Sequence, residues 1–165
     1  MKRIDTAALL LLALCLVGLF AHLASVPAMS LDEAWIGLFA TRLRSAGFYT
    51  PHQMNHYTGP LYARLAAAFF DARGLSLESL RLPGAFLNAA ALLGLWSHLR
   101  RRVTPEAAAS WVLLCASSAY FLMKSRLGWE VYALQPILIF GTLCVLARPG
   151  GTAALAALTM LGVQN

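Results

Sequence analysis

The chain has 165 residues, of which 59% are hydrophobic and only 12% are charged, where about 25% charged is usual for a soluble domain. A water-soluble enzyme of this composition would lack surface charge. The 13 Lys and Arg residues outnumber the 7 Asp and Glu residues, but they form no basic stripe with interleaved aromatic residues, which argues against nucleic-acid binding. The composition therefore indicates an integral membrane protein.

Four tracts of the sequence contain no charged residue and have the length of a membrane span. They predict an all-α, polytopic membrane helix bundle with spans at about 7–26, 82–99, 107–123 and 131–147. A fifth apolar helix is predicted to start at about 152 and is still apolar at Asn165. We therefore expect residues 1–165 to be the truncated N-terminal part of a longer transmembrane domain.

The distribution of basic residues predicts the orientation of the bundle, because Lys and Arg are retained on the cytoplasmic side. With the N-terminus inside, segments 1–6, 100–106 and 148–151 hold six basic residues in 17 positions, and the outer segments 27–81 and 124–130 hold seven in 62. This asymmetry predicts a cytoplasmic N-terminus and an extracytoplasmic loop at 27–81. The first tract also loosely resembles a signal peptide that ends at Val26-Pro27-Ala28, and an external N-terminus is the other alternative.

The loop at 27–81 is too long to be structureless, and it predicts two short interfacial helices. The first begins at the capping box Ser30-Leu31-Asp32-Glu33 and runs over about 31–46. The second, over about 60–73, opens at Gly59-Pro60 and is too short to cross a bilayer. Pro83 is expected to start the second spanning helix.

The acidic pair at the start of the first loop helix has two interpretations. Carboxylates in a first helical turn are favoured by the helix dipole without any chemistry, and this suits Glu33, which shares a face with Gly37, Thr41 and Arg44. Asp32 instead projects among Ile36, Phe39 and Leu43. A carboxylate on an apolar face is costly without a partner or a task, which makes Asp32 a candidate catalytic residue.

The segment 48–58 between the two loop helices is dense in aromatic and hydrogen-bonding side chains. Such a mixture suits carbohydrate, although a polar loop packed on its own helices has the same composition. His56 and Tyr57 are candidate substrate-binding residues here, and Arg64 and Glu130 are two more on the outer side. His52 and His56 are four apart with no obvious third ligand, so no metal site is predicted.

The second outer loop, Lys124 to Glu130, carries two cations. Lys124 and Arg126 could be no more than snorkelling side chains beside an interfacial tryptophan. Their functional interpretation is an anion site for a lipid phosphate, which arginine binds in bidentate fashion.

Taken in order, these motifs resemble the N-terminal part of integral-membrane glycosyltransferases of the GT-C class. The matching segments are LDEAWIGLFATRLRSAGFYTP, YTGPLYARLAAAFF, LSLESLRLPGAFLNAAALLGLW and KSRLGWE, within residues 5–150. The nearest relatives look like the protein O-mannosyltransferase and aminoarabinose transferase group, particularly its bacterial dolichyl-phosphate-mannose transferase-like members. The resemblance implies a bacterial inner or plasma membrane protein.

The resemblance also implies an activity and roles for particular residues. Members of this family transfer a sugar, with inversion, from a polyprenyl-phosphate carrier to a glycan, lipid or protein acceptor on the extracytoplasmic side. The acidic pair matches Asp32 and Glu33, with Asp32 as the general base, and Arg126 with Lys124 would bind the donor phosphate. The stretch Thr58-Gly59-Pro60 lacks the lysine that aminoarabinose transferases carry there. The sugar, the acceptor and any divalent-metal requirement are left open.

A non-enzymatic multi-pass protein, such as a transporter fragment or an assembly factor, is the competing hypothesis. Transporters tend to place ionisable residues near the bilayer midplane. The predicted spans contain no Asp, Glu, Lys or Arg, and the polar groups gather outside. This arrangement favours chemistry at the membrane surface, in a fragment expected to be inactive without its missing helices.

Overall fold

The computed structural model describes residues 2–46 and 60–146, and all regular secondary structure in these ranges is helical. The elements are α1 (Lys2–Phe20), α2 (Leu31–Ala46), α3 (Leu61–Arg73), α4 (Leu77–Leu99), α5 (Pro105–Ser117), α6 (Ala119–Lys124) and α7 (Glu130–Leu146). The all-α prediction is confirmed. The expected fifth helix at 152–165 lies outside the described residues.

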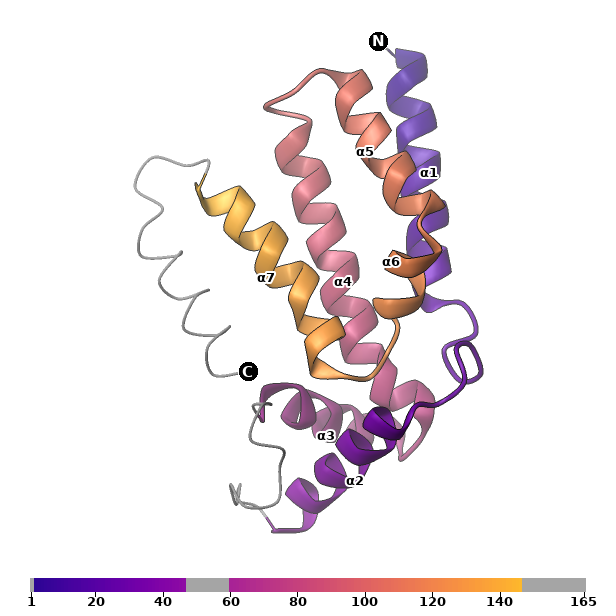
Figure 1. Ribbon diagram of the computed structural model, residues 1–165, viewed down its shortest axis with the longest axis vertical. Helices are drawn as coiled ribbons and strands as arrows, with labels where there is room; N and C mark the ends of the chain where they lie inside the picture. The colour runs from indigo at the N-terminus through magenta and orange to yellow at the C-terminus, as the bar shows by residue number, and fades with distance from the viewer. Residues whose placement is uncertain (1, 47–59, 147–165) are drawn as a thin grey trace.

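The helices form two groups (Figure 1). The first is a bundle in which α4 packs along α7 and α1 packs along α5. The second is the pair α2 and α3, which lies across one end of that bundle, with α3 packed against α4. The N-terminus of α1 and the turn between α4 and α5 lie at the opposite end, and α7 runs from the α2 and α3 side toward that end.

Helices α2 and α3 coincide closely with the predicted ranges 31–46 and 60–73. The apolar stripe of α2 includes Ile36, Phe39 and Ala40, which repeat at helical spacing and are buried. These residues share one core with Tyr62 and Phe70 of α3 and with parts of α4 and α7. Burial of this core holds the helix pair against the end of the bundle.

Helix α4 begins earlier than predicted, at Leu77 rather than at about 82. The hydroxyl of Ser76 caps it by accepting a hydrogen bond from the N–H of Ser79 (3.1 Å). Pro83 therefore lies inside the helix, and the expectation that it starts a helix is wrong. A side chain at Gly84 would meet the hydroxyl of Tyr62 at 3.0 Å and Ala133 at 3.1 Å, so this glycine allows α4 to approach α3 and α7 closely.

The first and third predicted tracts are not single helices over their whole length. Helix α1 ends at Phe20, and residues 21–26 form turns rather than the end of a span at 26. The third tract is interrupted at Ser118, where the backbone is extended and the hydroxyl caps α6 by accepting from the N–H of Phe121 (3.1 Å). Serine side chains favour such caps over helix interiors. The fourth tract, predicted at 131–147, corresponds to α7, which begins and ends one residue earlier than predicted.

Among the described helices, α4 alone is long and apolar enough to cross a membrane. Its 23 residues correspond to about 34 Å at 1.5 Å per residue, against about 30 Å for a hydrocarbon core. The apolar parts of α1 and α7, Thr6–Phe20 and Val131–Leu146, are shorter.

Candidate functional site

The start of α2 has the reciprocal hydrogen bonds of a capping box. The N–H of Glu33 donates to the hydroxyl of Ser30 (3.2 Å), and the N–H of Ser30 donates to Oε2 of Glu33 (3.2 Å). This is the geometry that the Ser-Leu-Asp-Glu spacing predicts. It fixes where α2 begins, and it brings the Glu33 carboxylate back toward the preceding segment of the chain.

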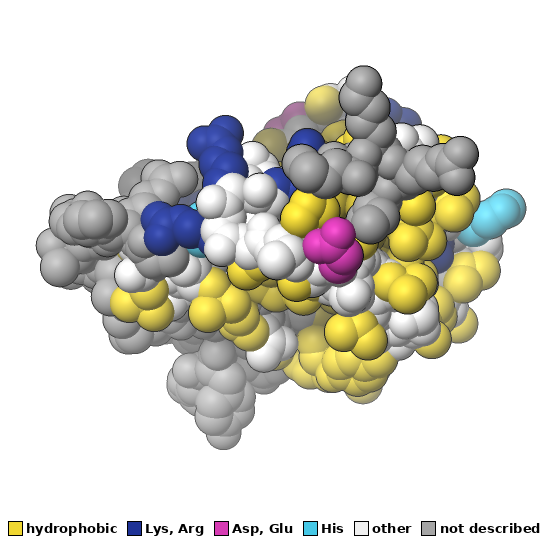
Figure 2. Space-filling model, turned by 90° about the horizontal axis from the view of Figure 1, so that it is seen from above, with side chains coloured by type: hydrophobic (Ala, Val, Ile, Leu, Met, Phe, Trp, Pro, Cys, Tyr) yellow, Lys and Arg dark blue, Asp and Glu magenta, His cyan; other side chains and the backbone are white. Residues whose placement is uncertain are grey.

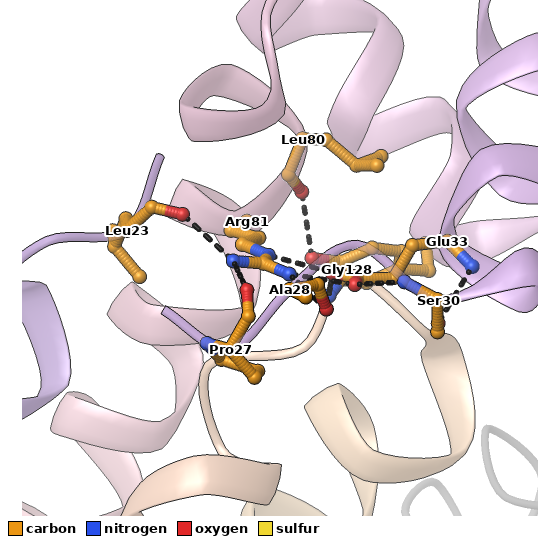
Figure 3. A network of polar contacts seen from close by, with 9 residues as sticks. Leu23, Pro27, Ala28, Ser30, Glu33, Leu80, Arg81 and Gly128 are labelled. Atoms are coloured by element: carbon orange, nitrogen blue, oxygen red, sulfur yellow. Dashed lines mark hydrogen bonds and ion pairs between the residues drawn. The ribbon is translucent and has the colours of Figure 1, made fainter. Parts of the chain in front are cut away.

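The Glu33 carboxylate is fully buried and forms a two-pronged ion pair with Arg81 of α4, which is also fully buried. Nε of Arg81 donates to Oε1 (2.7 Å) and Nη2 donates to Oε2 (2.7 Å). The N–H of Gly128 also donates to Oε1 (2.7 Å). Figure 3 shows these contacts converging from α2, α4 and the segment before α7. Buried charges are tolerated when they are paired and hydrogen-bonded in this way.

Arg81 has further acceptors on the segment that joins α1 to α2 (Figure 3). Its Nη1 donates to the carbonyls of Leu23 and Pro27, both at 2.8 Å, and its Nη2 lies 3.4 Å from the carbonyl of Ala28. The rigid fork of donors on a guanidinium suits such a convergence. One side chain thus connects α4 with α2 and with the connection that leads into it.

The environment of Glu33 keeps its carboxyl ionised. Burial by itself would raise its pKa, but the hydrogen bonds from Arg81, Gly128 and Ser30, together with the positive charge of Arg81, hold the pKa below its ordinary value of 4.5. Glu33 is therefore an anion at neutral pH.

Asp32 and Glu33 have the opposite placement to the one predicted from the helical wheel. Asp32 is exposed and Glu33 is buried, so the expectation that Asp32 faces the apolar side is wrong. A helical wheel of α2 contains only the residues of α2. Arg81, which lies 48 residues later in the sequence, compensates the buried charge of Glu33 and is therefore not represented in it. Asp32 has solvent access beside a rigidly held neighbour.

The segment from Ser125 to Gly128 is buried and is held by Asn88 of α4. Nδ2 of Asn88 donates to the carbonyls of Ser125 (3.0 Å), Gly84 (3.0 Å) and Ala133 (3.3 Å). Arg81 and Asn88 are seven residues apart, two turns of helix, and therefore lie on one face of α4. This face carries the polar groups that organise the site.

The sequence analysis did not identify Arg81, Asn88 or Gly128 as site residues. A signal existed for Asn88, which is an amide in the middle of a tract without charges. Polar residues in such tracts commonly face the interior of a bundle and bond to neighbouring helices. Arg81 and Gly128 both bond to Glu33, which is far from them in the sequence. No local sequence pattern indicates such a contact.

Lys124 and Arg126, the two cations before α7, are both engaged with the protein. Arg126 is 7% exposed; its Nη2 donates to the carbonyl of Ala21, and its Nε–H has no hydrogen-bond partner among the described residues. Burial lowers the pKa of Arg126, and the charge of Arg81 acts in the same direction. Nζ of Lys124 lies 4.1 Å from the ring centre of Tyr132, a cation–π distance.

The remaining predicted site residues are placed by the structure only in part. Arg64 is exposed on α3, and Glu130 is the first residue of α7. His56 and Tyr57 lie outside the described residues. Within the described ranges, no group of three His, Cys, Asp or Glu side chains is arranged to hold a metal ion.

The described geometry therefore unites the acidic start of α2 with the basic segment before α7 through one hydrogen bond, from Gly128 to Glu33. Comparisons of this chain with protein-family models, with curated proteins and with solved structures found no match.

Proposed function

We propose that this chain is the N-terminal part of a polytopic membrane glycosyltransferase that uses a polyprenyl-phosphate sugar as donor. The observation that carries the proposal is the contact between Glu33 and Gly128 (2.7 Å). It joins the segment that contains Asp32 to the segment that contains Lys124 and Arg126, although 95 residues separate the bonded pair. A base and phosphate-binding cations at one end of a bundle are the minimum that such a transfer needs.

The membrane part of the proposal is supported by the surface of the bundle. Large apolar side chains are exposed along α1, α5 and α7, where a water-soluble protein would expose mainly polar residues. They are Leu9, Leu10, Leu14, Val17, Leu113, Leu114, Ile139, Leu143 and Leu146. Lipid chains would cover these side chains in a bilayer, with α4 as the central span.

In the proposed reaction, the carboxylate of Asp32 removes the proton from the acceptor hydroxyl. The hydroxyl oxygen then forms a bond to the anomeric carbon as the bond from that carbon to the phosphate oxygen breaks, which inverts the configuration. Arg126 and Lys124 stabilise the charge on the departing polyprenyl phosphate. An exposed carboxylate is accessible to such an acceptor, and Asp32 is exposed.

Glu33 has a different role in this proposal. Its carboxylate already accepts hydrogen bonds from Arg81, Gly128 and Ser30, which leaves it poorly placed to accept a substrate proton. We assign it as a positioning residue that keeps Asp32 and the segment 124–128 at a fixed separation.

The test is sugar transfer by Asp32→Asn in membranes that contain the full-length protein, with radiolabelled polyprenyl-phosphate mannose as the probe donor. General-base catalysis contributes about 10²- to 10⁴-fold, so we expect turnover to fall by at least about a hundredfold. Asp71→Asn is the matched control, because Asp71 is an exposed aspartate paired with Arg44 on the same pair of helices.

Near wild-type turnover of Asp32→Asn would remove Asp32 as the base. Other polyprenyl-phosphate sugars are assayed in the same way. If the wild-type protein consumes none of these donors, the non-enzymatic multi-pass protein becomes the better interpretation.

A further inference from the structure

Two hollows flank the end of α4 that lies farthest from α2 and α3. The larger has a volume of about 460 Å³ and lies between the last turns of α4 and the second half of α7. The smaller, of about 430 Å³, lies on the neighbouring face of α4, and both are lined by Ser97 and Arg101. Volumes of this size are typical of small-ligand sites.

The rim of these hollows is basic. His98, Arg101 and Arg102 line the larger hollow, and Arg100 and Arg101 line the smaller. The nearest acidic residue in sequence, Glu106, lies in the first turn of α5 and lines neither hollow. Figure 2 looks onto this end of the molecule and shows several Lys and Arg side chains, one nearby acidic side chain and hydrophobic side chains around them.

The walls below this rim are apolar. Leu95, Ile137 and Phe140 line the larger hollow, and Leu93 and Trp96 line the smaller. The guanidinium of Arg100 lies 5.6 Å from the ring centre of Trp96, so this cation is held over the apolar wall. A ligand that fits both surfaces has an anionic head and a hydrocarbon tail.

We propose that the basic end of α4 is a binding site for an anionic phospholipid. Arg101 and Arg102 bind the phosphate, and one acyl chain lies in the larger hollow between α4 and α7. Basic pockets between helices at a membrane surface bind acidic lipid head groups in this manner. The proposal requires that the bundle lies in a membrane, but it does not depend on any transferase chemistry.

The position of the site also separates it from the proposed transfer reaction. The α4–α5 turn and the acidic start of α2 lie at opposite ends of the molecule (Figure 1). A lipid bound at Arg101 and Arg102 would therefore occupy the other leaflet from a donor bound near Asp32, and loss of one site leaves the other intact.

The experiment measures lipid retention by native mass spectrometry on the purified full chain in a neutral detergent, with phosphatidylglycerol or phosphatidylcholine added. Each arginine near a membrane surface contributes about fivefold to the affinity for an anionic lipid, from about 1 kcal/mol per residue. The double variant Arg101→Gln/Arg102→Gln should therefore bind phosphatidylglycerol about thirtyfold more weakly than the wild type. Arg73→Gln, which changes an exposed arginine at the other end, should bind it normally.

A second variant tests the hydrocarbon part of the site without changing its charge. An added Cβ at Gly94 has nothing within 4 Å, and Gly94 lines the larger hollow. Gly94→Leu should fill this hollow and weaken phosphatidylglycerol binding at least about fivefold, because burying an acyl chain contributes about 0.8 kcal/mol per CH₂ group. Thermal unfolding without lipid establishes that each variant is folded.

Four results would overturn the proposal. They are equal retention of phosphatidylcholine, undiminished phosphatidylglycerol binding by the double arginine variant, undiminished binding by Gly94→Leu, and displacement of the lipid by inorganic phosphate at millimolar concentration. The last result would identify a simple anion site. Sugar transfer is not measured in this experiment, so its outcome is independent of the proposed enzymatic function.

Discussion

Replacing Glu33 by Gln isolates the contribution of one buried charge. The amide keeps the shape of the side chain and an oxygen that can accept from the N–H of Gly128, so the packing changes little. Arg81, which is 0% exposed, then loses its only carboxylate partner among the described residues and keeps only the carbonyls of Leu23, Pro27 and Ala28. The guanidinium of Arg81 then lies in the protein interior with no carboxylate beside it among the described residues.

Removing one partner of a buried ion pair typically lowers the free energy of unfolding by about 3–5 kcal/mol. This corresponds to roughly a hundredfold to several-thousandfold change in the unfolding equilibrium constant. The matched control is Glu78→Gln, because Glu78 pairs with Arg73 across an exposed 3.3 Å contact. Such surface pairs contribute about 0–1 kcal/mol.

Unfolding of the full chain in mixed micelles, followed by circular dichroism as sodium dodecyl sulfate is added, measures the difference. The double variant Glu33→Leu/Arg81→Leu completes the test, since replacing both charges by apolar residues is often close to neutral. We expect it to be more stable than Glu33→Gln alone. If Glu33→Gln loses no more stability than Glu78→Gln, the ion pair does not organise this end of the bundle and the reasoning is refuted.

Two further predictions concern the same network. Gly128→Ala places a Cβ 2.8 Å from Cγ of Leu80 and 3.3 Å from Oε1 of Glu33, so it should lower the free energy of unfolding by about 1–3 kcal/mol. The control is Gly94→Ala, whose added Cβ has nothing within 4 Å and which should leave the free energy of unfolding unchanged or raise it by up to about 1 kcal/mol. Equal effects of the two substitutions would contradict this account. Because the pKa of Glu33 is lowered on folding, its stabilising contribution is complete above the ordinary value of 4.5 and is lost as pH falls through the native pKa. The stability difference between wild type and Glu33→Gln should therefore be constant from neutral pH down to about that value and shrink below it, and a difference that already shrinks near neutral pH would show that another group is responsible.

The parts of the fold that could be predicted are those that local chemistry decides. The capping box at Ser30 and Glu33 and the positions of α2 and α3 depend on residues within one or two turns of each other.

The interruption at Ser118, which was not predicted, depends on a single side-chain cap in an otherwise apolar run. Hydropathy averaged over a span-length window does not detect one such residue.

The part of the site that could not be predicted depends on distant residues. The face of α2 that carries Glu33 looks polar and solvent-exposed when it is considered alone, and Arg81 reverses that assignment. The contact from Gly128 could not be predicted either, because its donor is a backbone N–H, which every residue except proline has. The contact between the start of α2 and the segment before α7, and the different environments of Asp32 and Glu33, required the tertiary structure.

The guanidinium of Arg81 also constrains the order in which this protein assembles. It bonds to Leu23, which is 58 residues earlier in the sequence, and to Glu33, which is 48 residues earlier. Glu33 also accepts a hydrogen bond from Gly128, which is 95 residues later than Glu33. Until the ribosome has delivered residue 128, Glu33 lacks one of its donors and α2 has no complete docking surface. Closing loops of this length opposes folding entropically. Helices α2 and α3 are therefore synthesised early but pack into their final position late. The end of the protein that contains Asp32 and Glu33 takes its final form only after α4 and the segment before α7 are in place.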